Sequence, residues 1–465
     1  MKRYLSLDML RGLSIFGMVF SAIIPYGVLP AWMYHIQNPP PHHKFDMSVS
    51  GISWVDLVFP VFIFCMGVAI PIAGRKREGQ SPDKRGDLLY IANVAERFIM
   101  LWLFSYLYVF LNFSTAQGWW AQLATVIGFL SLFPLYYVFA KDLAVRWRVI
   151  IRSAALILVT LIIIYGHYRF DEVISITRSG IIIFLLAFLY LLGALIWYYT
   201  RDNLKWRAVA FGAVLLFTAV TIPMGLQPKL YAIPEIRWFF NMEYIYFLLI
   251  LIPATYVGDL IQKRLSIPGG YDPFKRESGE GGRGVVVAAV ALYILWMMFA
   301  LYKGHYLANI VVSLFSCGII YYLVKERIPV YKRESIIAAA LAVAGSVAVI
   351  IEGSITKSPC TISYCFITTA ISIYLLMLAD RLSHSFGSSY FVRIFAGAGS
   401  NPLMSYIAFG SFVMPLFKVT GVILIYNAAY PAGYPWIGVL RAATVVLLTM
   451  AIVAKMSEKR LFWRA

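Results

Sequence analysis

The chain contains a long succession of apolar segments, each close to the length of a membrane-spanning helix, and this feature limits its fold more than any other. About 20 mostly apolar residues in a helix cross the hydrocarbon core of a bilayer. Hydrophobic residues make up 61% of the 465 residues and charged residues only 13%, whereas soluble domains carry about a quarter charged residues. We therefore expect an all-α integral membrane helix bundle that forms a single transmembrane domain over residues 1–465.

The apolar segments predict about fourteen transmembrane helices, within a range of about twelve to fourteen. By residue number, the predicted spans are 13–29, 54–73, 91–113, 119–140, 149–165, 180–199, 208–226, 244–261, 285–302, 306–324, 336–351, 363–378, 394–417 and 437–454. An even number of crossings returns the chain to the side on which it began. Both termini are therefore expected on the same side of the membrane.

Lysine and arginine residues gather in alternate connections between these spans. Such clusters mark the cytoplasmic side of an inner-membrane protein, and they account for the net charge of +18. The pattern predicts cytoplasmic termini, a periplasmic loop at 30–53 and a cytoplasmic glycine-rich loop at 262–284. We expect a multi-pass protein of the bacterial inner membrane. No basic face alternates with base-stacking aromatic residues, so a nucleic acid is not an expected partner.

The four cysteines are Cys65, Cys317, Cys360 and Cys365, and they lack the paired spacing of a structural zinc site. We therefore expect no metal site. Cys360 and Cys365 lie on or beside a connection that we place outside the cytoplasm. A disulfide between them is geometrically conceivable there, and two free thiols are the favoured interpretation.

Polar residues that could carry chemistry gather between the first two predicted spans or at the rim of the second. They are His35, His42, His43, Lys44, Asp46 and Asp56. Histidine suits general acid/base work near neutral pH, and a nearby carboxylate can fix its tautomer. The alternative is a hydrated loop with surface histidines. A zinc site is disfavoured because two adjacent histidines rarely complete a tetrahedral set.

Ionisable residues also lie at the predicted cytoplasmic ends of the helices. Asp8 and Arg11 are three residues apart at the mouth of the first helix, a spacing that lets them pair on one face. Glu96 and Arg97 point to different faces of the third helix, so each needs another partner or an aqueous cavity. Arg97 is a candidate phosphate contact.

Several motifs resemble the transmembrane acyltransferase family that includes heparan-α-glucosaminide N-acetyltransferase. The resemblance rests on both ends of the chain and is poor in the middle. The motifs are Ser6-Leu7-Asp8 with Leu10-Arg11-Gly12, Gly17-Met18-Val19, Gly51 with Asp56-Leu57-Val58-Phe59-Pro60, Phe62-Ile63-Phe64, Thr361-Ile362-Ser363-Tyr364, Asn401 with Tyr406, and Lys459-Arg460-Leu461-Phe462-Trp463.

The resemblance implies transfer of an acetyl group from cytosolic acetyl-CoA to the amine of a sugar on the far side of the membrane, with an essential histidine near the second helix. Counting back from Asp56, the matching position is Asp46, and the family's upstream asparagine falls on Ala22. We expect His43, in the same loop, to reach the point in space of that histidine. The expected catalytic residues are therefore His43, as general base or acetyl carrier, and Asp46 or Asp56, to orient its ring.

Donor phosphates need cationic groups on the cytoplasmic side. We expect Arg11, Arg97 and Arg393 to contact acetyl-CoA, with Asp8 and Asn401, which lie in motifs shared with the family, completing its binding site. The other expected partners are the lipid bilayer and an amino sugar or glycan acceptor. A homodimer is left open.

A second function from a different class also follows from the resemblance. Asn38-Pro39-Pro40-Pro41, His43 and the segment 54–60 resemble a bacterial branch linked by genome context to N-acetylglucosamine uptake or use. The alternative is therefore an inner-membrane transporter for such a sugar, and a scaffold is a third candidate. A transporter needs polar side chains mid-membrane. The mid-helix positions here are mostly Leu, Ile, Val and Phe, which favours the enzyme.

Overall fold

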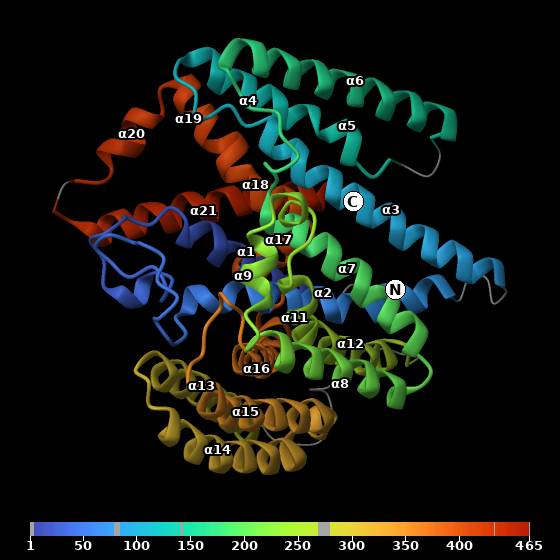
Figure 1. Ribbon diagram of the computed structural model, residues 1–465, viewed down its shortest axis with the longest axis vertical. Helices are drawn as coiled ribbons and strands as arrows, with labels where there is room; N and C mark the ends of the chain where they lie inside the picture. Colours follow the sequence, from blue (N-terminus) through green and yellow to red (C-terminus); the bar gives the residue numbers. More distant parts are fainter. Residues whose placement is uncertain (1–3, 79–83, 140–142, 268–279, 432, 465) are drawn as a thin grey trace.

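The computed structural model describes residues 4–78, 84–139, 143–267, 280–431 and 433–464, and Figure 1 shows them as a bundle of helices. Within these ranges the regular structure is helical, apart from one isolated β-bridge between Tyr137 and Trp463. Thirteen helical segments of the described chain are long and apolar enough to cross a membrane. The predicted all-α, multi-pass helix bundle is confirmed, and the number of spans lies within the predicted range.

The long helices supply most of the crossings. They are α1 (Leu5–Ser21), α2 (Trp54–Glu78), α3 (Lys84–Phe110), α6 (Val145–Phe170), α7 (Ile181–Thr200), α8 (Leu204–Thr221), α12 (Leu248–Leu265), α13 (Glu280–Tyr302), α14 (Tyr306–Arg327), α15 (Lys332–Glu352), α16 (Ile362–Phe386) and α21 (Pro435–Glu458). Helix α1, with 17 residues, is shorter than the thirteen segments counted above.

Shorter helices continue or connect these crossings. They are η1 (Ala31–Met33), α4 (Trp119–Ser131), α5 (Phe133–Tyr136), α9 (Leu226–Tyr231), α10 (Pro234–Arg237), α11 (Glu243–Tyr246), η2 (Pro329–Tyr331), α17 (Tyr390–Gly399), α18 (Pro402–Ala408), η3 (Phe409–Val413), α19 (Met414–Thr420) and α20 (Ile423–Ala428). Of the predicted loop 262–284, residues 268–279 lie outside the described residues.

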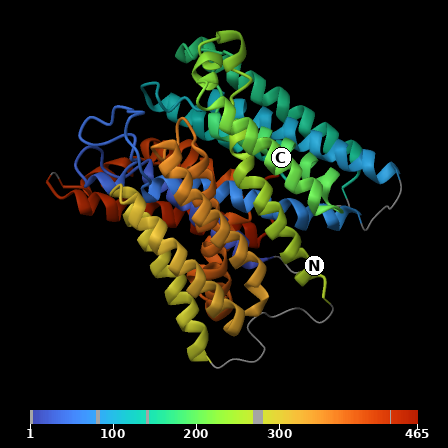
Figure 2. The ribbon, with the colours of Figure 1, turned by 60° about the horizontal axis from the view of Figure 1, so that its bottom comes forward.

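Helices α2 and α16 form the centre of the bundle. α2 packs against α1 and α12, and α16 packs against α1, α12 and α15. Most of the apolar window of α16, 83%, is buried inside the protein, against 17% for α6. The apolar side chains of the peripheral helices therefore face lipid. A helix can face lipid because its backbone hydrogen bonds are made within the helix. Figure 2 shows α13, α14 and α15, in yellow to orange, as neighbouring helices at one edge of the molecule.

The first helix begins earlier than predicted. The hydropathy pattern predicted a span at 13–29, but α1 runs from Leu5 to Ser21. Charged side chains are costly in a membrane unless they are paired, and here Asp8 pairs with Arg11 at 3.3 Å while Arg11 also donates to the carbonyl of Gly399 at 3.2 Å. Because these contacts satisfy the charges, the helix continues through them instead of starting after them.

The predicted span 394–417 is also not a single helix. α17 ends at Gly399, and α18 begins at Pro402, which occupies the first turn of the new helix. Proline suits this position because it has no N–H to donate. A π-helical turn, Phe409–Val413, then interrupts the segment again before α19. The break places Asn401 between two helices.

The connections meet at two opposite ends of the bundle, as the alternation of charge predicted. At one end, Gln37 bonds Ser358, and Ser50 lies 2.7 Å from the hydroxyl of Tyr306. At the other end, Tyr4 donates to Asp380 at 2.7 Å, and Arg264 pairs with Glu334. We refer to the first as the outer end and to the second, where the basic clusters lie, as the inner end.

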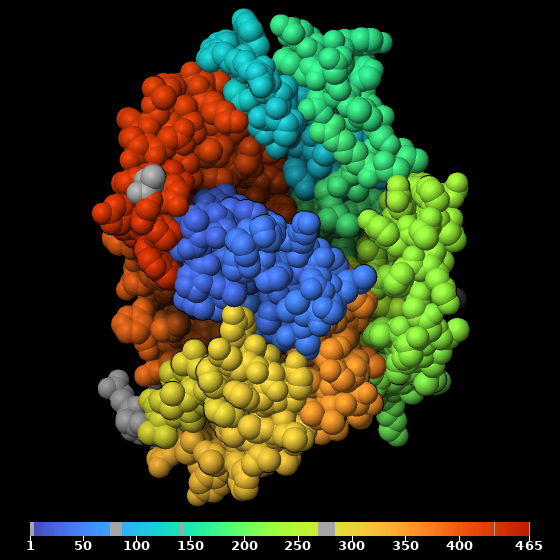
Figure 3. All heavy atoms as spheres, turned by 60° about the vertical axis from the view of Figure 1, so that its left-hand side comes forward, coloured from blue at the N-terminus to red at the C-terminus, as the bar shows by residue number. Residues whose placement is uncertain are grey.

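Residues 30–53 form a long connection at the outer end. Apart from the 3₁₀ turn η1 it contains no helix. Figure 3 shows the blue N-terminal segment at the centre of one face, with red C-terminal segments above it and yellow to orange segments below it. The loop is therefore surrounded by elements from distant parts of the chain.

Candidate active site

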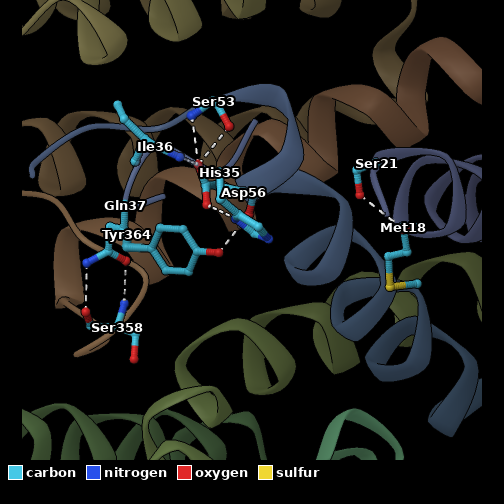
Figure 4. A network of polar contacts seen from close by, with 9 residues as sticks. All are labelled: Met18, Ser21, His35, Ile36, Gln37, Ser53, Asp56, Ser358 and Tyr364. Carbon is cyan, nitrogen blue, oxygen red and sulfur yellow. Dashed lines mark hydrogen bonds and ion pairs between the residues drawn. The ribbon is translucent and has the colours of Figure 1, made fainter. Parts of the chain in front are cut away.

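A buried carboxylate at the start of α2 organises the outer end. Asp56 lies in the first turn of α2, where the helix dipole favours negative charge. Its Oδ2 accepts hydrogen bonds from the backbone N–H of Ser53 at 3.0 Å, the Ser53 hydroxyl at 2.8 Å and the backbone N–H of Ile36 at 3.3 Å. Figure 4 shows these groups converging on the carboxylate. The local sequence thus holds Asp56 in a fixed orientation.

The other oxygen of Asp56 holds a histidine. His35 Nδ1 lies 2.6 Å from Asp56 Oδ1, and the two side chains differ sharply in exposure, 37% for His35 and 2% for Asp56. An ionised carboxylate only accepts hydrogen bonds, so Nδ1 carries the proton and Nε2 of the neutral ring is an acceptor. A buried carboxylate that orients a solvent-accessible imidazole in this way prepares the ring for general-base work.

A second loop, residues 353–361, closes over this pair from the C-terminal half of the chain. The Gln37 side-chain amide donates to the carbonyl of Ser358 at 2.7 Å, and the N–H of Ser358 donates back to Gln37 at 3.1 Å. Tyr364, in the first turn of α16, donates its hydroxyl to the backbone carbonyl of Asp56 at 2.7 Å. Two loops more than three hundred residues apart therefore form one surface.

Lys357 adds a cation to this surface. Its Nζ lies 6.0 Å from the centre of the Phe59 ring, and its charge interacts with Asp56 and Glu243. Burial lowers the pKa of Lys357, and the two carboxylates oppose that change. The structure gives its ammonium no hydrogen bond among the described residues, so three N–H donors remain free for a bound molecule.

Glu243 completes the cluster from the start of α11. Its Oε1 accepts from the Gln227 amide at 3.3 Å and from the Ser358 hydroxyl at 3.4 Å. The site thus combines an imidazole, an ammonium and two carboxylates. No three His, Cys, Asp or Glu side chains of the described ranges form a group that could hold a metal ion.

His43, the expected catalytic base, occupies a different environment. Its ring is buried, its Nε2 accepts a hydrogen bond from the backbone N–H of Gly27 at 3.0 Å, and the rings of Tyr26 and Tyr34 lie 3.8 Å and 4.4 Å from it. The expectation that Asp46 or Asp56 orients this ring is wrong. Asp56 pairs with His35, and Tyr26, Tyr34 and Gly27 hold His43 in place.

Asp46 caps a turn of the loop. It is exposed, and it accepts hydrogen bonds from the N–H of Ser48 at 2.8 Å and from its hydroxyl at 2.6 Å. These bonds lower the pKa of Asp46. Among the three expected catalytic residues, only Asp56 therefore has a histidine as its partner. The spacing of His35 did not mark it as the partner of Asp56, because most of the 20 residues between them form an irregular loop.

The five residues expected to bind acetyl-CoA do not form one site. Asp8 and Arg11 pair with each other and contact Gly399. Arg97 packs its guanidinium over the ring of Tyr190, 4.3 Å from the ring centre, where α3 meets α7. The remaining two, Arg393 and Asn401, have partners near the C-terminus.

Asn401 holds the C-terminal tail. Its side-chain amide donates to the carbonyl of Leu461 at 2.9 Å, and its oxygen accepts from the N–H of Trp463 at 3.1 Å. Trp463 is buried between aromatic side chains of α3, α4 and α5. Arg393 is exposed and pairs with Glu458 at 2.6 Å. Both the nitrogen and the oxygen of the Asn401 side-chain amide are thus engaged within the protein, which indicates a structural role.

Comparison with known proteins connects this site to one family. No curated protein matches the chain. The model of a family described as a domain of unknown function, DUF5009, matches residues 3–261. The match is longer than half of the chain and includes His35, Asp56 and Glu243, although it ends before Lys357. The chain therefore belongs to the DUF5009 family.

Proposed function

We propose that this protein is a membrane acyltransferase that moves an acetyl group from cytosolic acetyl-CoA to an amino sugar or glycan at the periplasmic face. The observation that carries the proposal is the pairing of His35 Nδ1 with the buried carboxylate of Asp56 at 2.6 Å. The motif resemblance to transmembrane acyltransferases supports the choice of reaction. The Asp56 of that pair lies within one of those motifs.

In this reaction His35 is the general base. Its Nε2 takes a proton from the acceptor nitrogen or hydroxyl as that atom attacks the acetyl carbonyl carbon, and the carbon–sulfur bond of the thioester breaks. The proton then passes from His35 to the departing thiolate. Asp56 stabilises the imidazolium between these two transfers and keeps its orientation. Base catalysis of this kind contributes about 10²- to 10⁴-fold.

Lys357 and Glu243 are suited to contact the acceptor. The Lys357 ammonium has unused donors, and one oxygen of Glu243 has no hydrogen bond among the described residues. A sugar hydroxyl both donates and accepts hydrogen bonds, so a neighbouring cation and carboxylate can bind adjacent hydroxyls. On the inner side, Arg11 remains the candidate for the donor phosphates.

A sugar transporter is the second candidate. The observation that favours it is the interrupted segment from α17 to α19, with a break at Asn401–Pro402 and a π-helical turn at Phe409–Val413. Transporters place substrates at such breaks. Against this, the Asn401 amide is already bonded to the tail.

Membrane vesicles with and without the protein separate the two. They would be supplied with radiolabelled acetyl-CoA on the cytoplasmic side and a panel of amino sugars on the other. We expect labelled acetyl-sugar that depends on the protein and is lost in His35→Ala. Uptake of N-acetylglucosamine without any acetyl transfer, at an equal rate in His35→Ala, would favour the transporter.

A further inference from the structure

Two thiols that the proposed reaction does not use lie against each other beside the site. The Sγ atoms of Cys360 and Cys365 are 3.3 Å apart, and both side chains are fully buried. The other two cysteines lie elsewhere, Cys65 within α2 and Cys317 within α14, where Cys317 contacts the hydroxyl of Tyr293 at 3.5 Å. The chain therefore contains one adjacent pair and two isolated thiols.

The backbone holds the pair together. Cys360 is the last residue before Thr361, the N-cap of α16, and Cys365 lies in the first turns of that helix. The remaining sulfur contacts are weak: Cys360 Sγ lies 3.7 Å from the carbonyl of Thr361, and Cys365 Sγ lies 3.6 Å from that of Tyr246. A disulfide has a sulfur–sulfur bond of about 2.05 Å, so the sulfurs need to approach by about 1.3 Å.

The pair also lies at the end of the bundle that favours oxidation. Cys360 lies in the loop 353–361, whose Ser358 bonds Gln37 of the loop 30–53, so both loops are at the outer end. The basic clusters lie at the opposite end, which the positive-inside rule assigns to the cytoplasm. Disulfides form and persist in the periplasm, whereas cytoplasmic thiols are kept reduced.

We propose that Cys360 and Cys365 form a disulfide in the mature protein, which ties the loop 353–361 to the start of α16. The oxidant is the disulfide of an exported thiol–disulfide oxidoreductase. One cysteine thiolate attacks that disulfide and forms a mixed disulfide, and the second thiolate then attacks the first cysteine's sulfur. The pair loses two electrons and two protons, and the oxidant leaves as a dithiol.

Oxidation belongs to the folding stage. Burial raises the pKa of the Cys360 thiol, and a buried thiol is a poor nucleophile because little of it is thiolate. The loop is accessible to an oxidoreductase only before it packs against the loop 30–53. Once formed, the bond restrains Lys357 and Ser358 beside the site. This inference does not depend on the reaction that the site catalyses.

Differential alkylation of the full-length protein tests the bond directly. Cells are quenched with acid, the protein is denatured and blocked with N-ethylmaleimide, and then it is reduced and treated with iodoacetamide before peptide mass spectrometry. We expect Cys65 and Cys317 to carry the first label and Cys360 and Cys365 the second. The first label on all four cysteines would overturn the proposal.

A thermal measurement tests the restraint. We expect dithiothreitol to lower the melting temperature of the wild-type protein and of Cys65→Ser, the matched control with an isolated thiol. The double variant C360S/C365S should already melt at the lower temperature and should not respond. A wild-type melting temperature that does not change on reduction would show that the bond restrains nothing. If the double variant does not fold, the alkylation pattern and the effect of dithiothreitol on the wild-type melting temperature still test the proposal.

Discussion

His35 and His43 lie in the same loop but have opposite surroundings, which makes them a matched pair of positions. His35 exposes its ring and pairs with a buried carboxylate, whereas His43 is buried and gives its acceptor nitrogen to a backbone N–H. A ring nitrogen already bonded to the main chain is unsuited to take a proton from a substrate. The residue that is closer to Asp56 in sequence is therefore the structural one.

We predict that His35→Ala lowers kcat/KM for acetyl transfer by about 10²- to 10⁴-fold per folded molecule. It also removes the partner of the buried Asp56 Oδ1, which lowers stability. His43→Ala should lower stability without this loss of activity. It leaves the Gly27 N–H without its acceptor, which costs about 1–3 kcal/mol of folding free energy, and kcat per folded molecule should stay close to wild type. Kinetics and melting curves of both variants check this. Loss of kcat in His43→Ala alone would reverse the assignment.

The lowered pKa of Lys357 leads us to predict that stability depends on pH. Burial lowers its pKa from the ordinary value of 10.5, so between the lowered value and 10.5 the unfolded chain binds more protons than the folded protein. Stability therefore rises with pH through that window because of this residue. We expect the melting temperature of the wild type, relative to that of Lys357→Met, to rise as pH increases from about 8 to about 10. A difference that is constant or shrinks over this range would contradict the prediction.

At the scale of the elements, α1 and α17 approach closely because of two glycines. A Cβ atom at Gly399 would lie 1.9 Å from the carbonyl oxygen of Asp8, and one at Gly12 would lie 2.0 Å from that of Phe395. Small residues allow two helix backbones to come this close in a membrane. The contact positions the Asp8–Arg11 pair against the end of α17.

We predict that Gly399→Ala destabilises the protein by about 1–3 kcal/mol or more, because the clash is with backbone that has no room to move. Gly212→Ala is the matched control, since a Cβ atom there meets nothing within 4 Å. Melting of the two purified variants in detergent gives the comparison. Equal melting temperatures would show that α1 and α17 can move apart to accommodate the new Cβ atom without a loss of stability.

The C-terminal tail provides a second prediction at this scale. Asn401 bonds the backbone at Leu461 and Trp463, so Asn401→Ala leaves two backbone groups without partners. We expect carboxypeptidase to remove the tail of this variant faster than that of the wild type, with a loss of about 1–3 kcal/mol in folding free energy. Arg393→Ala, which breaks only an exposed pair, should behave like the wild type. Unchanged cleavage in Asn401→Ala would mean that Trp463 packing alone holds the tail.

For the whole molecule, the apolar surface and the two polar ends describe a protein that crosses a bilayer many times. Large apolar side chains are exposed all along peripheral helices such as α6, at Val145, Val149, Ile157, Leu161 and Tyr165. In water such a surface would drive aggregation, and in lipid it is the expected contact surface.

We predict the orientation of this assembly from its basic clusters. Single cysteines introduced at Asp46 and Lys229, which are exposed at the outer end, should react with an impermeant thiol reagent in intact cells. Cysteines at Lys325 and Arg333, exposed at the inner end, should react only after permeabilisation. The native cysteines are buried and give a low background. The opposite labelling pattern would invert the orientation and remove the reason to expect oxidation of Cys360.

The sequence alone determined the membrane-helix architecture and most helix positions, because hydropathy over about 20 residues is a local property. The predicted spans 54–73, 180–199 and 306–324 match α2, α7 and α14 closely. The sequence-based prediction of helix boundaries failed where a contact with a distant residue overrides the local hydropathy. α1 continues through Asp8 and Arg11 because Gly399 lies beside them, and the helix at 394–417 breaks where Asn401 binds the tail.

The composition of the site was likewise decided only by the tertiary structure. The histidines and Asp46 of the loop 30–53 were visible as candidates, and so was Asp56 at the start of α2. Which histidine meets Asp56 depends on the path of an irregular loop, and Lys357 arrives from a connection about three hundred residues later. Local patterns carry no information about contacts at that separation. Burial and hydrogen bonding in the folded bundle made His43 a structural residue and left His35 accessible.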